Sequence, residues 1–140
     1  MKKTGFIVLL MAVAGIMIAA QTKPVPKKTM DAGKKVYDLY CLACHQQDGA
    51  GVPRLNPPLV KTTYVLGDKK RLIDIVLKGM NEEIEIDGNI YSNVMAPHDF
   101  LPDQEIADLL TFVRNSFGNK ASIVTAAEVK AERAKLNTKQ

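Results

Sequence analysis

Tryptophan is absent from this chain of 140 residues, and cysteine and histidine occur only twice each. Two cysteines exclude the framework of several disulfides that stabilises many small exported domains. A zinc site is disfavoured as well, because adjacent Cys44 and His45 would struggle to ligate one tetrahedral ion together with Cys41. No basic stripe interleaved with aromatic residues is present, so we expect no nucleic-acid binding despite the pI of about 9.1.

The basic residues lie mainly at the two ends of the chain. The formal charge is +4 overall, whereas residues 30–118 alone sum to −4. An acidic domain would be attracted to a basic patch on a partner in a salt-dependent way. The same charge is also ordinary for a solvated surface.

Residues 1–20 have the composition of a secretory signal peptide. Lys2 and Lys3 precede an uncharged apolar run that ends in small residues. We expect cleavage and a periplasmic protein; the alternative is a membrane anchor through residues 5–20, although this run is short for a spanning helix. No cysteine follows the run as a site for a lipid anchor. Residues 21–29 contain two prolines and three lysines and are predicted to be an extended linker.

The remaining chain predicts one small, mainly helical domain over residues 30–118. Apolar spacing indicates a helix from Met30 to Cys41 with Asp31 as its N-cap, a second helix between Asp68 and Gly79, and a third from Asp103 to Phe117. Residues 49–58 are rich in Gly and Pro and predict an irregular loop. Alternation around Asp87-Gly88 predicts a short β-hairpin. The fold class is therefore all-α with a short hairpin-like loop.

Residues 119–140 form a charged tail. The sequence T-A-A-E from Thr125 is a capping box that predicts a helix start. The helix that follows has little apolar face, so we expect a solvated, partly helical appendage.

The feature that carries chemistry is C-x-x-C-H, formed by Cys41, Cys44 and His45. This is the attachment signature of c-type haem. Two thiols on one helical turn can each add to a vinyl group at a porphyrin edge, and the following imidazole can then bind the iron. A disulfide between these cysteines would close only a very short loop and stabilise little. A thioredoxin-like pair would need a preceding strand and a βαβ context, which the sequence does not show.

Haem iron has six coordination positions, so a second protein ligand is to be sought. Met95 lies in a loop with Pro97, Met80 follows the second helix, and His98 is the remaining histidine. A methionine in a loop can approach the face opposite His45, whereas one at a helix end is more often a core residue. Met95 is therefore preferred, and His98 is the second choice. His/Met ligation raises the reduction potential and suits electron transfer.

With Cys41-x-x-Cys44-His45 followed by Met95 in this order, residues 30–118 resemble a class I monohaem cytochrome c. Supporting features are the segment QQDGAGVPRLNPPL and the helix E-I-A-D-L-L-T-F-V-R. The chain is similar to small bacterial cytochrome c modules that occur free or fused to dehydrogenases, oxidases and nitrite reductases. Pro102 stands where many members have Ser or Thr, and Met95-Ala96-Pro97 where many have Met-Pro.

The resemblance implies a role for each residue at the site. Cys41 and Cys44 would hold the thioether bonds of one haem c, His45 would be the proximal iron ligand, and Met95 the distal one. A proline carbonyl, from Pro57 or Pro58, would accept a hydrogen bond from the His45 ring. The first and last helices would cross each other. Gly33 and Tyr37 of the first helix would pack on a face of the last helix formed by Ile106, Leu110 and Val113.

Three functions are compatible with this assignment. The first is a monomeric one-electron carrier, not an enzyme, between exported or membrane redox enzymes such as a dehydrogenase, a reductase or a terminal oxidase. The second is a dedicated haem subunit of such a complex. The third is a haem enzyme or sensor, which would require an open distal position and hence no bond from Met95.

Overall fold

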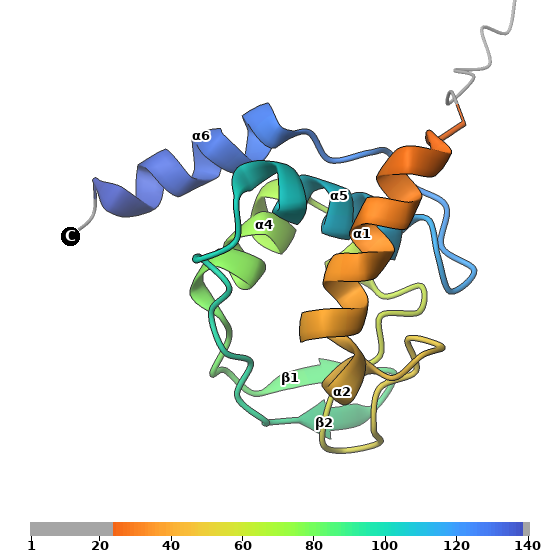
Figure 1. Ribbon diagram of the computed structural model, residues 1–140. Helices are drawn as coiled ribbons and strands as arrows, with labels where there is room; N and C mark the ends of the chain where they lie inside the picture. Colours follow the sequence, from red (N-terminus) through yellow and green to blue (C-terminus); the bar gives the residue numbers. More distant parts are fainter. Residues whose placement is uncertain (1–23, 139–140) are drawn as a thin grey trace, which may run out of the picture.

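The computed structural model describes residues 24–138 (Figure 1). The predicted signal peptide, residues 1–20, and the start of the predicted linker lie outside the described residues. Six helices and one hairpin follow each other in the order α1 (Lys27–Tyr40), α2 (Leu42–His45), α3 (Thr63–Leu66), α4 (Lys69–Lys78), β1 (Ile84–Ile86), β2 (Asn89–Tyr91), α5 (Asp103–Arg114) and α6 (Ala126–Asn137). The prediction of a mainly helical domain with one short hairpin is confirmed.

The first helix begins earlier than predicted. α1 starts at Lys27, inside the range assigned to an extended linker, and its N-cap residue is Pro26. Pro26 supplies the backbone carbonyl for the first helical hydrogen bond, from the Met30 N–H at 3.2 Å. Asp31 is not the N-cap; its carboxylate pairs with Lys27 one turn earlier at 2.6 Å, and such a pair favours the helix by a few tenths of a kcal/mol at most.

The crossing of α1 and α5 is the central packing contact of the domain (Figure 1). Gly33 lies directly on the backbone of α5: a Cβ atom at this position would stand 2.1 Å from the Asp108 carbonyl oxygen and 2.6 Å from Phe112 Cβ. Only a hydrogen in place of a side chain permits this approach. Tyr37, one turn further along, is fully buried and packs its ring against Phe112 and Phe117. The predicted crossing at Gly33 and Tyr37 is observed, but on α5 these residues contact Asp108 and Phe112, whereas Leu110 and Val113 of the predicted face line a cavity.

The last helix of the predicted domain ends three residues earlier than expected. α5 stops at Arg114, and Phe117 takes a left-handed φ of 59° instead of continuing the helix. This turn returns the Phe117 ring to the aromatic cluster with Tyr37 and Phe112. At its other end, Pro102 is the N-cap residue and provides no side-chain cap, as the sequence indicated.

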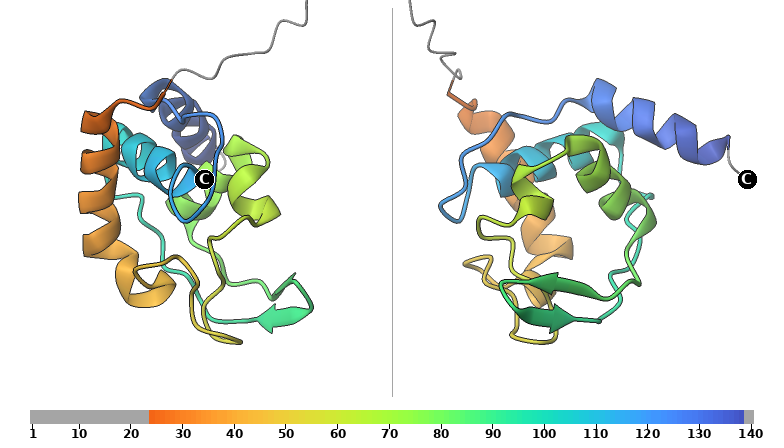
Figure 2. Two further views of the ribbon diagram at one scale, coloured as in Figure 1. Left: turned by 90° about the vertical axis from the view of Figure 1, so that its right-hand side faces the viewer. Right: turned by 180° about the vertical axis from the view of Figure 1, so that it is seen from behind.

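α4 and the hairpin follow the prediction closely. The Asp68 carboxylate accepts a hydrogen bond from the Lys70 N–H at 2.9 Å, and Gly79 ends the helix. In the hairpin, Ile84 pairs with Tyr91 across the turn at Asp87-Gly88, which has φ values of 50° and 74°. Ile84, Ile86 and Tyr91 form a small apolar cluster of their own. The hairpin is therefore a separate wall below the helical core (Figures 1 and 2).

The C-terminal tail is not a solvated appendage. α6 packs against α5 and α4, and Figure 2 shows it lying over both helices. The predicted capping box is present, with the Thr125 and Glu128 side chains each bonded to the other's backbone. Val129 is fully buried, and Glu132 is only 6% exposed. The sequence carries little signal for this packing, because α6 docks through buried Val129, partly buried Ala126 and Leu136, and several polar contacts, without a continuous apolar stripe.

Buried polar side chains fasten the segment between α5 and α6 to the domain. Arg114 donates to the carbonyls of Val65, Gly67 and Ser122. Asn119 donates to the carbonyls of Leu59 and Val113 and accepts from the Lys61 N–H. Among the backbone groups satisfied in this way, the carbonyls of Val65 and Val113 belong to buried residues, which need such partners.

Thr111 offers a selective test of this fastening. Its hydroxyl donates to the Val124 carbonyl at 3.1 Å and accepts from the Val124 N–H at 2.9 Å, and the residue is fully buried. Thr111→Val keeps the shape of the side chain but leaves the N–H and carbonyl of Val124 without a hydrogen-bond partner. The free energy of unfolding should therefore fall by about 1–3 kcal/mol. Denaturant titration of the purified protein measures this, with exposed Thr63→Val as control. A loss equal to that of the control would contradict the assignment.

Candidate functional site

The C-x-x-C-H motif lies at a break between two helices. α1 ends at Tyr40, and Cys41, with a φ of −114° and a ψ of −31°, joins it to α2. The Cys41 carbonyl then accepts from the N–H groups of Cys44 and His45, at 3.2 and 2.9 Å. This single turn places two free thiols and an imidazole together, with Cys44 exposed, Cys41 partly covered and His45 buried.

The His45 ring is oriented by a backbone carbonyl. Its Nδ1 lies 2.9 Å from the carbonyl oxygen of Pro57. A carbonyl can only accept, so Nδ1 carries the proton and donates it, and Nε2 retains its lone pair. Burial lowers the pKa of His45, and the Pro57 bond raises it by less. The pKa is therefore lowered, and the ring favours the neutral form that a metal needs. Of the two prolines left open by the sequence, Pro57 makes this contact, while Pro58 lines the neighbouring cavity.

Two further hydrogen bonds fix the chain just after His45. The Tyr37 hydroxyl donates to the Gln46 carbonyl at 2.6 Å, and burial raises the pKa of this phenol, so it stays a donor. The Gly51 N–H donates to the His45 carbonyl at 3.1 Å. The backbone at His45 and Gln46 is therefore held both by a side chain of α1 and by the loop that follows α2.

A small apolar cavity of about 80 Å³ opens beside His45. The lining combines His45 and Cys41 with side chains that are almost all apolar. They come from the loop after α2, from α3, α4, the hairpin, the loop before α5 and α5 itself: Pro57, Pro58, Leu59, Thr62, Tyr64, Val65, Leu72, Ile75, Val76, Met80, Ile84, Ile86, Met95, Leu109, Leu110 and Val113. Cys44 lines an adjoining hollow that shares His45 and Met95 with this cavity.

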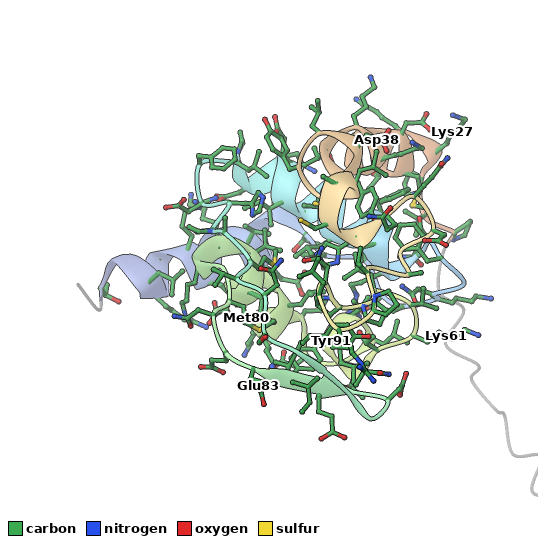
Figure 3. The ribbon with its side chains drawn as sticks, turned by 90° about the horizontal axis from the view of Figure 1, so that it is seen from below. Lys27, Asp38, Lys61, Met80, Glu83 and Tyr91 are labelled. Carbon is green, nitrogen blue, oxygen red and sulfur yellow. The ribbon has the colours of Figure 1, made fainter. Side chains whose placement is uncertain are left out.

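Both methionines considered as ligands reach the cavity. Met80 and Met95 form an isolated backbone bridge, with N–H to carbonyl distances of 2.9 and 2.8 Å in the two directions. Gly79 makes this possible: it has a φ of 72°, and a Cβ there would stand 2.3 Å from the Met95 carbonyl oxygen. Met95 packs on the helical core. Met80, which is labelled in Figure 3, packs on the hairpin cluster.

His98, the second choice as ligand, lies in an aromatic group at the rim. Its ring centroid is 6.2 Å from that of Tyr40 and 5.8 Å from that of Phe100. It lines the outer hollow but not the inner cavity, and its backbone N–H donates to the Val76 carbonyl at 2.8 Å. Phe100 is 63% exposed, so this group faces solvent in part.

The two thiols differ in their surroundings. Burial, followed by the neighbouring Cys44, raises the pKa of Cys41 to about 12, so this thiol stays protonated at neutral pH. Cys44 is exposed at the surface. One attachment point thus lies in the cavity wall and the other at its outer edge.

These residues fit a haem. A flat, largely apolar macrocycle needs an apolar slot, two thiols at one edge and axial donors in the walls, and the cavity offers each of these. The clearest single observation is the His45 ring, turned by Pro57 so that Nε2 keeps a lone pair at a cavity otherwise lined by hydrocarbon and sulfur.

Comparison with known proteins agrees with this geometry. The Cytochrome c family profile matches residues 30–117. The chain belongs to the cytochrome c family. Cytochrome c-552 of Thermus thermophilus is 36% identical over 117 residues, which is 77% of this chain and 88% of that protein. The cytochrome c subunit of the quinone alcohol dehydrogenase of Gluconobacter oxydans is 36% identical over 104 residues, or 71% of this chain but 21% of the subunit.

Family membership establishes the cofactor and the type of function. This cytochrome c carries a covalently bound haem c with its iron and is an electron-transfer protein. The fructose dehydrogenase cytochrome subunit of Gluconobacter japonicus is 34% identical over 114 residues, so a cytochrome of similar length and larger dehydrogenase subunits are both among its relatives. The profile ends before α6, which starts at Ala126.

Sequence reasoning missed three features of this cytochrome c. The bridge between Met80 and Met95 joins distant segments and had no local signal. The aromatic group around His98 combines α1 with the loop before α5, which only the fold brings together. The polar contacts of α6 were also missed, because the sequence shows Arg133 only as one of several charged residues in a helix that we expected to be solvated.

Proposed function

We propose that this chain is an exported one-electron carrier in which Cys41 and Cys44 bind the haem covalently and His45 and Met95 are the axial ligands. The proposal places it between redox enzymes, such as a dehydrogenase and a reductase or terminal oxidase. The single observation that carries it is the His45 ring held by Pro57 at an apolar cavity that Met95 also lines.

The residues around the cavity have separate tasks. When bound, haem supplies an iron that cycles between two oxidation states one electron apart. Pro57 fixes the orientation and tautomer of His45, and a neutral imidazole needs no proton exchange when the charge of the site changes. The apolar lining excludes water, which keeps the surroundings the same in both states and favours fast transfer. No residue is required to take up substrate or move a proton.

Met95 is proposed over Met80 because of the elements that hold each side chain. Met95 packs on the helical core and precedes Pro97, which restricts the loop. Met80 packs with the hairpin cluster. His98 lies at the rim with Tyr40 and Phe100 and outside the inner cavity. A thioether ligand raises the reduction potential, as suits a carrier.

A second candidate is a dedicated subunit of a larger redox complex. The similarity to dehydrogenase cytochrome subunits favours it, although the chain spans only about a fifth to a quarter of those proteins. Its chemistry would be the same, and only the permanence of the partner would differ. A haem enzyme would need an open distal position, which is at odds with Met95 at the cavity.

The periplasm is proposed from the basic and apolar residues at the N-terminus. Over residues 24–138, no helix is long and apolar enough to cross a membrane. The excess of acidic groups over residues 30–118 supports docking to a basic surface on the partner.

The optical spectrum of the exported protein, in both redox states, tests the proposal. We expect haem that resists acid-acetone extraction, a low-spin spectrum, and a weak sulfur-to-ferric-iron band that Met95→Ala abolishes and Met80→Ala retains. Extractable haem would contradict the roles of Cys41 and Cys44. A high-spin spectrum with ready CO binding would favour the enzyme or sensor instead.

A further inference from the structure

The loop that carries Met95 into α5 is fastened at three places. At its start, the Met95 backbone is bridged to Met80. In its middle, the His98 N–H donates to the Val76 carbonyl of α4 at 2.8 Å. Its last part, residues 99–102, turns at Asp99 and Phe100 and then enters α5 at Asp103.

This last part is held by one side chain from α6. Arg133 donates from Nη1 to the Asp99 carbonyl at 2.5 Å, from Nη2 to the Leu101 carbonyl at 2.7 Å, and from Nε to the Asp103 carboxylate at 2.7 Å. Within residues 24–138, no other side chain from outside the loop bonds the backbone of residues 95–102. Arg133 and Asp103 are 26% and 28% exposed, so water weakens the pair only in part.

A guanidinium is well suited to these three contacts. Its donors diverge in a fixed fork, which can reach two carbonyls and a carboxylate at once. Both carbonyls belong to backbone that would move if the loop lifted away from the cavity. Arg133 thus joins α6 to the end of the loop near α5, whereas the bridge with Met80 holds its start.

α6 is itself a firm support for Arg133. Val129, one turn before it, is fully buried, and Glu128 closes the capping box and pairs with Lys69 of α4. The support therefore connects α4, which leads to Met80, with the loop that carries Met95. α6 lies outside the region that the family profile matches, so this contact is an addition to the cytochrome c domain.

We propose that Arg133 is a positioning residue for Met95: by holding the carbonyls of Asp99 and Leu101, it keeps the Met95 loop closed over the cavity. The inference rests on the proposed ligation by Met95. When the loop opens, an external ligand can replace the methionine, and the apparent affinity of that ligand scales with the open fraction. Removing Arg133 should raise that fraction.

Imidazole binding to the oxidised, haem-loaded protein measures the opening. It is followed by loss of the sulfur-to-iron band, for the wild type, Arg133→Met and Arg133→Lys. Since hydrogen bonds to charged groups are the stronger ones, Arg133→Met should bind imidazole about tenfold more tightly or more. Arg133→Lys keeps the charge but loses the fork, so it should restore only part of the wild-type value.

Two controls separate positioning from general loosening of the tail. Lys130→Met removes an exposed positive charge from the same helix. Glu128→Gln weakens the capping box and the pair with Lys69 without touching the loop. We expect Glu128→Gln to lower the denaturant midpoint but to leave imidazole affinity within about twofold of the wild type, as Lys130→Met should.

The outcomes are distinct. Unchanged imidazole affinity in Arg133→Met, or an equal rise in Glu128→Gln, would overturn the role of Arg133 while leaving the proposed ligation intact. Absence of the sulfur-to-iron band in the wild type would overturn ligation by methionine and the positioning role together. A selective rise in Arg133→Met with partial recovery in Arg133→Lys supports the proposal.

Discussion

Met95→His should lower the reduction potential of the haem protein by on the order of 0.1–0.3 V, a part of the roughly 0.8 V range that axial ligands control. The reason is that an imidazole stabilises the oxidised iron more than a thioether does. Spectroelectrochemical titration measures the potential. The sulfur-to-iron band should disappear in the same variant, while the haem stays low-spin.

Met80→His is the matched control for this experiment. Met80 lines the same cavity and is joined to Met95 by the backbone bridge, so the two variants introduce the same side chain at neighbouring positions. We expect the potential of Met80→His to stay within a few hundredths of a volt of the wild type, a small part of the axial-ligand range. A large fall in Met80→His, with none in Met95→His, would exchange their roles.

Gly33→Ala should reduce the free energy of unfolding by about 2 kcal/mol. Helix propensity alone would make alanine more stable than glycine by about 1 kcal/mol in α1. The added Cβ, however, would stand 2.1 Å from the Asp108 carbonyl oxygen. Neither helix backbone can yield as a flexible side chain would, so α1 and α5 must separate, and overpacking of this kind outweighs the propensity gain.

Denaturant unfolding of the haem-loaded protein, followed by far-UV circular dichroism, measures this loss. Lys35→Ala tests the propensity effect alone, because Lys35 lies on the exposed face of the same helix. The crossing would need reinterpretation if Gly33→Ala were as stable as the wild type or more so.

The sequence predicted the attachment motif because its chemistry is local. Cys41, Cys44 and His45 lie within one turn, and their spacing alone favours one cofactor. The neighbouring proline could be narrowed only to Pro57 or Pro58, since adjacent carbonyls differ by orientation and not by sequence. In the structure the hydrogen bond to His45 comes from Pro57.

The elements outside the motif were predictable only where their signals were local. Asp68 and Gly79 mark the ends of α4, and Asp87-Gly88 marks the hairpin turn, all as observed. The start of α1 and the end of α5 were predicted wrongly. At the end of α5, the tertiary packing of Phe117 overrides helix propensity. The docking of α6 depends on hydrogen bonds from Thr111 and Arg133 to distant backbone, for which hydrophobic periodicity gives no signal.

The contact between Gly33 and Asp108 also sets an order of assembly. These residues are far apart in the chain, and contacts of long sequence separation form late because loop closure must come first. During synthesis from the N-terminus, α1 and the C-x-x-C-H motif exist long before α5 and Arg133 do. The thiols of Cys41 and Cys44 are thus accessible before α5 packs against α1. The packing of α5 then closes the domain around the group that is attached at these cysteines.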